Sequence, residues 1–286
     1  AELAEPLAQH AALLHVARRR LAEATAGAAK GLGLLRQSGL FFEAPAVLRR
    51  EDAADMLQAW MDAPGAERAF ADALARDRLA VLDGALPEEV VGPLREELRR
   101  LRADGLLRPD PHDLCNPGHI SGYLPLQSAA LRAEFCERSP LLARACGLLM
   151  ALPGLLEALL PEELPEGSLT VPMTILASCY PPGAYYKEHL DNYGGSGDVP
   201  RKLTFILYCN SPSPAGGRLR LQPPRGGQDL LLAPAGGRLV AFWAEEVWHE
   251  VLPCEEDDRY ALTLWVFDRR RAEEDLGAGS VEVGDL

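Results

Sequence analysis

From about residue 170 onward, the chain consists of short apolar runs separated by paired glycines and prolines. The runs are 174–178, 185–189, 203–208, 218–221, 229–232, 238–243, 246–252 and 261–268. Short strands at about 8–12-residue spacing, with turns such as Pro223-Pro224 and Gly236-Gly237, are typical of a β-sandwich or a jelly-roll barrel. The C-terminal half therefore predicts a jelly-roll core over residues 170–268.

The N-terminal part of the chain has helical periodicity instead. Apolar residues recur at three- and four-residue steps in 5–28, 51–61 and 67–76. A short apolar run at 79–82 predicts a strand. Pro87 then predicts the start of a helix that extends to residue 103, because proline in the first helical turn costs no hydrogen bond. Residues 131–160 predict further helix, interrupted at Pro140 and Pro153.

These patterns predict an α+β chain, with a double-stranded β-helix (jelly-roll) core in the C-terminal half that N-terminal helices flank and support. The expected divisions are a helical N-terminal extension at 1–77, a main domain at 78–270 and an acidic tail at 271–286.

Composition limits the partners and the compartment. The net charge of −13 argues against a protein that binds the nucleic-acid backbone. The best candidate for a membrane span is broken by Pro153, Gly154 and Glu157, so no membrane partner is expected. None of the 6 cysteines forms a CxxC pair, which disfavours a zinc ribbon. Free thiols in a reducing compartment predict a cytoplasmic protein, with the nucleus as the alternative.

His189 and Asp191 form an HxD pair within the β region. In an extended segment, residues two apart point to the same side, so both side chains can reach one metal ion. His249 lies in a later strand-like run. Two histidines and one carboxylate form the facial triad of non-haem Fe(II) oxygenases, which leaves coordination positions open. Taken alone, an HxD pair is also explained by a chance surface pair.

Arg259 follows at the start of the last strand. Arginine suits bidentate capture of a carboxylate, such as the far end of a dicarboxylic co-substrate. The alternative is a surface ion pair with an acidic residue of the segment 255–258.

The residues around these positions resemble a known family. The ordered set is Cys179-Tyr180, Tyr186, His189-Leu190-Asp191-Asn192, the run 204–210 ending in Tyr208-Cys209-Asn210, Gly216-Gly217-Arg218-Leu219-Arg220, Phe242-Trp243, His249-Glu250-Val251 and Arg259-Tyr260-Ala261-Leu262-Thr263-Leu264-Trp265. This set is similar to the 2-oxoglutarate/Fe(II)-dependent prolyl 4-hydroxylases of the hypoxia-inducible-factor type. The similarity is dense over about residues 172–269 and loose over 79–104.

The resemblance implies an oxygen-sensing dioxygenase that hydroxylates a prolyl residue of a protein or peptide substrate and releases succinate and CO2. It implies Fe(II), 2-oxoglutarate and O2, with ascorbate supporting activity. The implied metal ligands and catalytic residues are His189, Asp191 and His249. The implied co-substrate residues are Arg259, Tyr208, Thr263 and Tyr180. The implied substrate residues are Tyr186, Arg201 and Trp265.

Three alternatives remain open. The same barrel fits a small-molecule or non-prolyl hydroxylase, since a fold does not fix a substrate. It also fits a catalytically silent binding module. A nucleic-acid demethylase of the same superfamily is disfavoured, because such enzymes carry a second arginine where this chain has Trp265.

The stretch 105–125 departs from the family, and its part 108–125 contains four of the chain's prolines. Loops of this length inside a compact domain are often functional, so we expect a lid over the site. His112 and His119 lie in this segment and are either ordinary loop residues or part of the lid.

Overall fold

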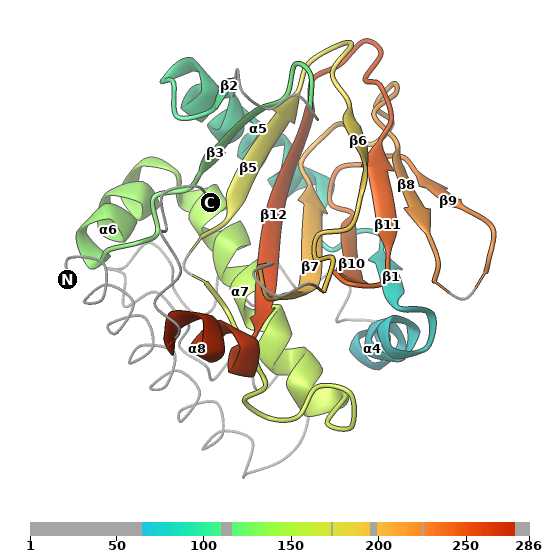
Figure 1. Cartoon of the computed structure of the whole chain (residues 1–286). Helices are drawn as coiled ribbons and strands as arrows, with labels where there is room; N and C mark the ends of the chain where they lie inside the picture. Colours follow the sequence, from blue (N-terminus) through green and yellow to red (C-terminus); the bar gives the residue numbers. More distant parts are fainter. Residues whose placement is uncertain (1–64, 110–115, 173, 195–198, 225, 278–286) are drawn as a thin grey trace.

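The computed structural model describes residues 65–109, 116–172, 174–194, 199–224 and 226–277. Its strands form two antiparallel sheets, with helices on one side of the larger sheet (Figure 1). The helices expected at 5–28 and 51–61 and the last residues of the expected acidic tail lie outside the described residues. The mixed helical and antiparallel content is consistent with the predicted jelly-roll.

The larger sheet has 8 strands in the order β1-β10-β7-β12-β5-β3-β2, and β4 pairs with β12. The strands are β1 (Leu79–Leu82), β2 (Arg108–Pro109), β3 (Ile120–Tyr123), β4 (Leu169–Thr170), β5 (Leu176–Tyr180), β7 (Arg201–Tyr208), β10 (Leu239–Trp243) and β12 (Arg259–Asp268). The smaller sheet has 4 strands in the order β6-β11-β8-β9. They are β6 (Tyr186–His189), β8 (Leu219–Gln222), β9 (Leu230–Leu232) and β11 (Trp248–Val251). The strands expected from the sequence are confirmed, while β2, β3 and β4 were not expected.

The helices are α4 (Ala66–Asp77), α5 (Glu88–Ala103), α6 (Ala129–Arg138), α7 (Pro140–Leu159) and α8 (Arg269–Gly277). The predicted strand at 79–82 and the predicted helix up to residue 103 are confirmed. α4 packs against the sheet, and the indole Nε1 of Trp243 donates to the Leu74 carbonyl at 3.1 Å. α8 occupies the first part of the segment expected as a tail.

Helix α7 differs from its expectation, because it continues through Pro153. The carboxylate of the buried Glu97 accepts hydrogen bonds from the backbone N–H groups of Leu141 and Leu142 and so satisfies the start of the helix. With 20 residues and a hydropathy of 1.5, α7 is also long and apolar enough to cross a membrane. It is largely buried against α5, α6 and β12, and in Figure 1 it runs behind the larger sheet. This packing accounts for its apolar composition.

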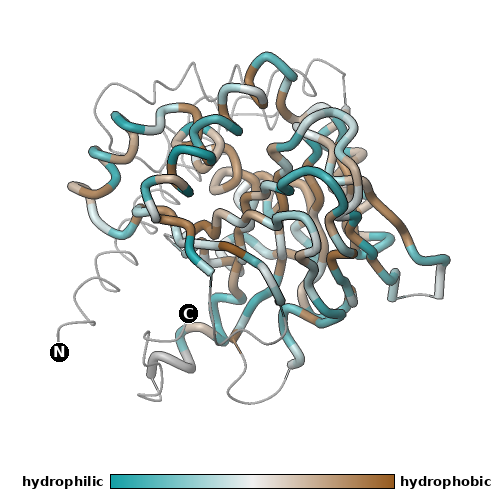
Figure 2. Tube along the Cα trace, turned by 90° about the horizontal axis from the view of Figure 1, so that it is seen from above, coloured by the Kyte–Doolittle hydropathy of each residue, from teal (hydrophilic) through white to brown (hydrophobic). Residues whose placement is uncertain are grey.

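The buried apolar residues form two clusters, which the alternation of β12 separates. Tyr260, Leu262 and Leu264 belong to the cluster that faces the helices, whereas Ala261 belongs to a second cluster between the two sheets. Successive strand residues point to opposite faces, so one strand serves both cores. Figure 2 shows hydrophobic segments gathered largely in the interior. The second cluster encloses the space in which the candidate site lies.

Two strands of the larger sheet lie within the segment expected as a lid. β2 pairs with β3, and β3 pairs with β5 from Ile120↔Cys179 to Tyr123↔Leu176. Gly122 sits so close to the Leu106 carbonyl that a Cβ would lie 2.3 Å from its oxygen. The lid interpretation is therefore wrong for residues 120–123, because ladder hydrogen bonds hold them to the sheet. Residues 110–115, with His112, lie outside the described part.

Candidate functional site

Strands β6 and β11 bring two histidines side by side. His189 and His249 are register partners in the antiparallel ladder, and their ring centroids lie 4.1 Å apart. The His249 ring also packs against Phe242 at 4.7 Å, in the space between the sheets. Its neighbour Trp248 points to the other face and is 38% exposed. The pairing of two short strands thus aims both imidazoles inward at one point.

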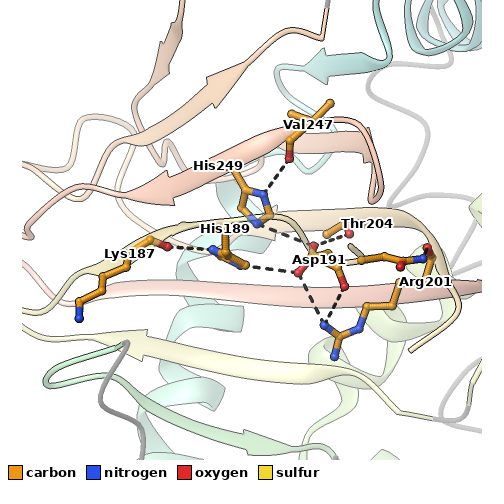
Figure 3. Close-up of polar contacts among 8 residues, drawn as sticks. Lys187, His189, Asp191, Arg201, Thr204, Val247 and His249 are labelled. Carbon is orange, nitrogen blue, oxygen red and sulfur yellow. Dashed lines mark hydrogen bonds and ion pairs between the residues drawn. The ribbon is translucent and has the colours of Figure 1, made fainter. Parts of the chain in front are cut away.

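Asp191 lies two residues after His189, the last residue of β6, and completes a cluster of three side chains. Its Oδ1 lies 3.7 Å from Nε2 of His189, and its Oδ2 lies 3.7 Å from Nε2 of His249. One donor atom from each residue lies within 4.8 Å of the others. Figure 3 shows the three side chains pointing toward one another. Among the described residues, this is the one group of His, Cys, Asp and Glu side chains that could hold a metal ion.

Backbone carbonyls orient both imidazole rings. Nδ1 of His189 lies 2.9 Å from the Lys187 carbonyl oxygen, and Nδ1 of His249 lies 3.2 Å from the Val247 carbonyl oxygen (Figure 3). A carbonyl only accepts, so we assign the proton to each Nδ1. Each Nε2 then keeps a free lone pair directed at Asp191. Metal-binding histidines have this arrangement, in which a second partner fixes the ring.

The carboxylate of Asp191 is buried but charged. Burial alone would raise its pKa, but His249, His189 and Arg201 outweigh burial and hold the pKa well below its usual range. Thr204 adds a hydrogen bond, in which its Oγ1 donates to Oδ2 at 2.6 Å. Burial is the main reason that the pKa of His249 falls to about 4. At neutral pH the cluster thus contains a neutral imidazole and an anionic carboxylate, the protonation state that metal binding requires.

Arg259 is a buried cation on the same inner surface. It is 4% exposed, and its guanidinium lies 4.9 Å from the ring centroids of both Tyr180 and Tyr208. Its NH2 group donates to the Tyr208 hydroxyl oxygen at 3.1 Å. A Cβ at Gly217 would lie 2.9 Å from the Arg259 Cδ, so glycine, at φ +59°, makes room for this side chain.

No carboxylate among the described residues pairs with Arg259, and its Nε has no hydrogen-bond partner there. The surface ion pair considered from the sequence does not form: Arg259 is buried, and Asp258 pairs with Arg102 at 2.6 Å. A buried charge without a counter-charge is costly. The pocket therefore fits an anionic ligand, and the Tyr208 hydroxyl, whose oxygen already accepts from Arg259, can donate its own hydrogen to it.

The structure also brings Arg201 and Trp265 together. The Arg201 guanidinium lies 4.1 Å from the Trp265 ring centroid, and its NH1 lies 3.7 Å from Oδ1 of Asp191. Thr263 lies on the same face of β12 as Arg259 and Trp265, opposite Ile206 of β7. Its side chain forms no hydrogen bond with Arg259 or Tyr208.

An aromatic wall borders the cluster on the side of β3. Tyr186 stacks on His189 at 4.2 Å between ring centroids. His119 stacks on Tyr180 at 4.4 Å and lies 6.3 Å from Tyr186. The sequence left His119 open between an ordinary loop residue and a lid residue. Only the pairing of β3 with β5 puts it beside Tyr180, so no local signal could have assigned it. Thr204, which donates a hydrogen bond to Asp191, enters the sequence analysis only as the first residue of the run 204–210 that resembles the family.

Comparison with known proteins supports these observations. Residues 175–267 match the 2OG-Fe(II) oxygenase superfamily. The human protein "Egl nine homolog 1" is 39% identical over 98 residues, which are 32% of this chain and 22% of that protein. The human "Prolyl hydroxylase EGLN3" is 38% identical over 104 residues, which are 34% of this chain and 42% of that protein. The chain thus spans less than half the length of either relative.

Solved structures agree on the fold. A prolyl-4-hydroxylase from Pseudomonas putida matches with a TM-score of 0.54 and 29% identity, over 71% of this chain and 99% of that one. A prolyl hydroxylase from Trichoplax adhaerens, in complex with a hypoxia inducible factor oxygen degradation domain peptide fragment, matches with a TM-score of 0.61 and 19% identity. That match covers 73% of this chain and 91% of the other and supports the fold alone. The sequence match, the fold and the cluster of His189, Asp191 and His249 therefore agree that residues 175–267 resemble a 2OG-Fe(II) oxygenase domain.

Proposed function

We propose that this chain is a 2-oxoglutarate- and O2-dependent dioxygenase that hydroxylates a prolyl residue of a protein or peptide substrate. The observation that carries the proposal is a two-histidine, one-carboxylate cluster on the same inner surface as Arg259, a buried arginine that pairs with no carboxylate of the described residues. The likeness of the chain to prolyl hydroxylases supports the choice of proline. We also propose that the two sheets form a double-stranded β-helix, as the prediction for 170–268 states.

In this proposal His189, Asp191 and His249 hold Fe(II). Three protein ligands leave positions for a co-substrate and for oxygen. Fe(II), 2-oxoglutarate and O2 together supply the oxidation, which converts 2-oxoglutarate to succinate and CO2 and which amino-acid side chains cannot perform unaided. The protein's own part is to orient the ligands. The Lys187 and Val247 carbonyls fix the rings, and Thr204 fixes the carboxylate.

Arg259 and Tyr208 would bind the far carboxylate of 2-oxoglutarate. The guanidinium supplies charge, and burial raises the pKa of Tyr208, so that its hydroxyl stays protonated and can donate. Tyr180, whose pKa burial also raises, covers the guanidinium. Thr263 is proposed to support this pocket from the next inward position of β12. The apolar walls of the second core cluster keep water out and strengthen the charge interaction.

Tyr186, Arg201 and Trp265 would line the substrate side. Trp265 holds the Arg201 guanidinium beside Asp191, which leaves a cation at the edge of the metal cluster. A peptide carbonyl or carboxylate is the chemistry that this cation can bind. The cytoplasmic or nuclear location, the supporting role of ascorbate and the lack of nucleic-acid and membrane partners stay predictions from the sequence.

The test of the reaction is mass spectrometry of lysate-derived peptides incubated with the protein, Fe(II) and 2-oxoglutarate. A +16 shift on proline that requires 2-oxoglutarate is the expected result. The His249→Ala variant serves as the control. Shifts on other residues, or on added small molecules only, would favour a different hydroxylase. Absence of succinate in every reaction would favour a silent binding module.

Replacing either ligand histidine should remove metal binding. His189→Ala and His249→Ala each delete one of three proposed ligands, so we expect titration calorimetry with Mn²⁺ to show no specific binding. His119→Ala removes an imidazole outside the cluster and should bind Mn²⁺ as the unmodified protein does. Normal Mn²⁺ affinity in His249→Ala would exclude the cluster as the metal site.

Arg259→Ala should raise the KM for 2-oxoglutarate by about tenfold or more, because loss of a buried charge-assisted contact costs roughly 2–5 kcal/mol. Mn²⁺ affinity should remain, since Arg259 lies outside the ligand cluster. Arg218→Ala, which removes an exposed arginine, is the matched control and should leave this KM unchanged. An unchanged KM in Arg259→Ala would show that the co-substrate binds elsewhere.

His119→Ala should raise the same KM by about two- to tenfold, because it removes a stacking contact worth roughly 0.5–1.5 kcal/mol from the Tyr180 ring. His119→Phe keeps a stacking ring and should restore the KM. Steady-state succinate formation at varied 2-oxoglutarate measures both variants. Equal values for the two variants would remove His119 from the pocket.

A further inference from the structure

A network of charged side chains lies on the outer face of the smaller sheet, directly behind the two ligand histidines. We call it the outer clamp and define it as Glu188, Arg220, Gln222 and Glu250. Alternate strand residues point to opposite faces. Glu188 and Glu250 therefore face outward, while their neighbours His189 and His249 face the metal cluster. Each ligand histidine thus has a carboxylate next to it in sequence on the opposite side of the sheet.

Arg220 joins these two carboxylates. Its NH2 group donates to Oε1 of Glu188 at 2.7 Å, and its Nε lies 2.8 Å from Oε1 of Glu250. Gln222 donates a second hydrogen bond to Oε1 of Glu188 at 2.5 Å. Arg220 is the register partner of Glu250, so its side chain passes across β11 to reach β6. The clamp therefore connects three strands.

Strand β6 has few ladder hydrogen bonds of its own. Backbone hydrogen bonds from Gly183 to the Cys254 carbonyl and from Asn192 to the Ala244 carbonyl anchor the chain on either side of it. β6 is the edge strand of the order β6-β11-β8-β9. Its described ladder pairs with β11 are His249↔His189 and Val251↔Tyr186, with an irregularity between them. Short, irregular edge pairing specifies register weakly. The position of the His189 backbone thus depends on contacts beyond the ladder, and the clamp adds one at the adjacent residue Glu188.

Arg220 also offsets the repulsion between the carboxylates of Glu188 and Glu250. Glu188 and Glu250 lie on neighbouring strands beside a register pair, and like charges across a ladder are destabilising. Arg220 places a positive group between them. Its side chain is 34% exposed, against 40% for Glu188 and 20% for Glu250, so solvent screens the network only in part. Without Arg220, the two carboxylates would push β6 away from β11.

We infer that Arg220 is a positioning residue of the metal centre, which holds His189 opposite His249 by tying Glu188 to Glu250. A metal ion tolerates errors of only about 0.2 Å in ligand distance, so a small shift of β6 is enough to weaken binding. The inference rests on the proposed metal site and adds to it a residue that touches neither metal nor substrate.

The test measures Mn²⁺ affinity by calorimetry and the visible absorption of bound Co²⁺, which reports ligand geometry. Arg220→Ala should weaken Mn²⁺ binding by about tenfold, the low end for groups that orient a metal ligand, and should alter the Co²⁺ spectrum. Arg220→Lys keeps a positive charge and should lie between Arg220→Ala and the unmodified protein. Adding Glu188→Gln and Glu250→Gln to Arg220→Ala removes the repulsion and should recover most of the affinity.

The control is Arg99→Ala, which removes an exposed ion pair with Glu96 on α5 and should change neither measurement. Mn²⁺ affinity in Arg220→Ala equal to that of the unmodified protein would overturn the inference and leave the metal site intact. A triple variant as weak as Arg220→Ala would also overturn it, because the loss would not come from the facing carboxylates. No Mn²⁺ binding by the unmodified protein would refute the proposed function itself.

Discussion

The antiparallel pairing of β6 with β11 is the contact on which the site depends. It places His189 opposite His249 and brings Asp191 to the end of the same strand. All three residues come from segments too short to hold this geometry alone. Neighbouring strands, backbone carbonyls and Thr204 therefore fix the side chains. The complete cluster of His189, Asp191 and His249 therefore depends on the sheet, which brings His249 to the local HxD pair.

The larger sheet makes this arrangement rigid. Its outer face buries the α7 side chains, and its inner face forms the wall of the site. β12 contributes to both, since its even-numbered residues from Tyr260 to Val266 face the helices, while Arg259, Thr263 and Trp265 face inward. The helices thus pack against one face of the larger sheet, and the opposite face carries the polar and charged residues of the site. This division places Arg259 on the inner face, where no carboxylate of the described residues pairs with it.

Two cations stand near the cluster and differ in their surroundings. Arg201 pairs with Asp191 and stacks on Trp265, so its charge is compensated. Arg259 lies among tyrosine rings with no carboxylate partner in the described part of the chain. Arg201 helps to lower the pKa of Asp191, a proposed metal ligand. Arg259 is free to bind an anionic ligand. The two arginines therefore differ in role because their burial and their contacts differ, although the residue type is the same.

The sequence by itself determined the strands of the β region and the α4 and α5 helices, and it predicted the three residues that the structure brings into one cluster. Periodicity and Gly/Pro turns are local signals, and the HxD pair needs only the geometry of one strand. Tertiary structure alone decided that β3 joins the larger sheet, that α7 continues through Pro153, and that His119 and Thr204 border the site. Those outcomes depend on strand pairing and on packing between segments distant in sequence, which no local pattern encodes.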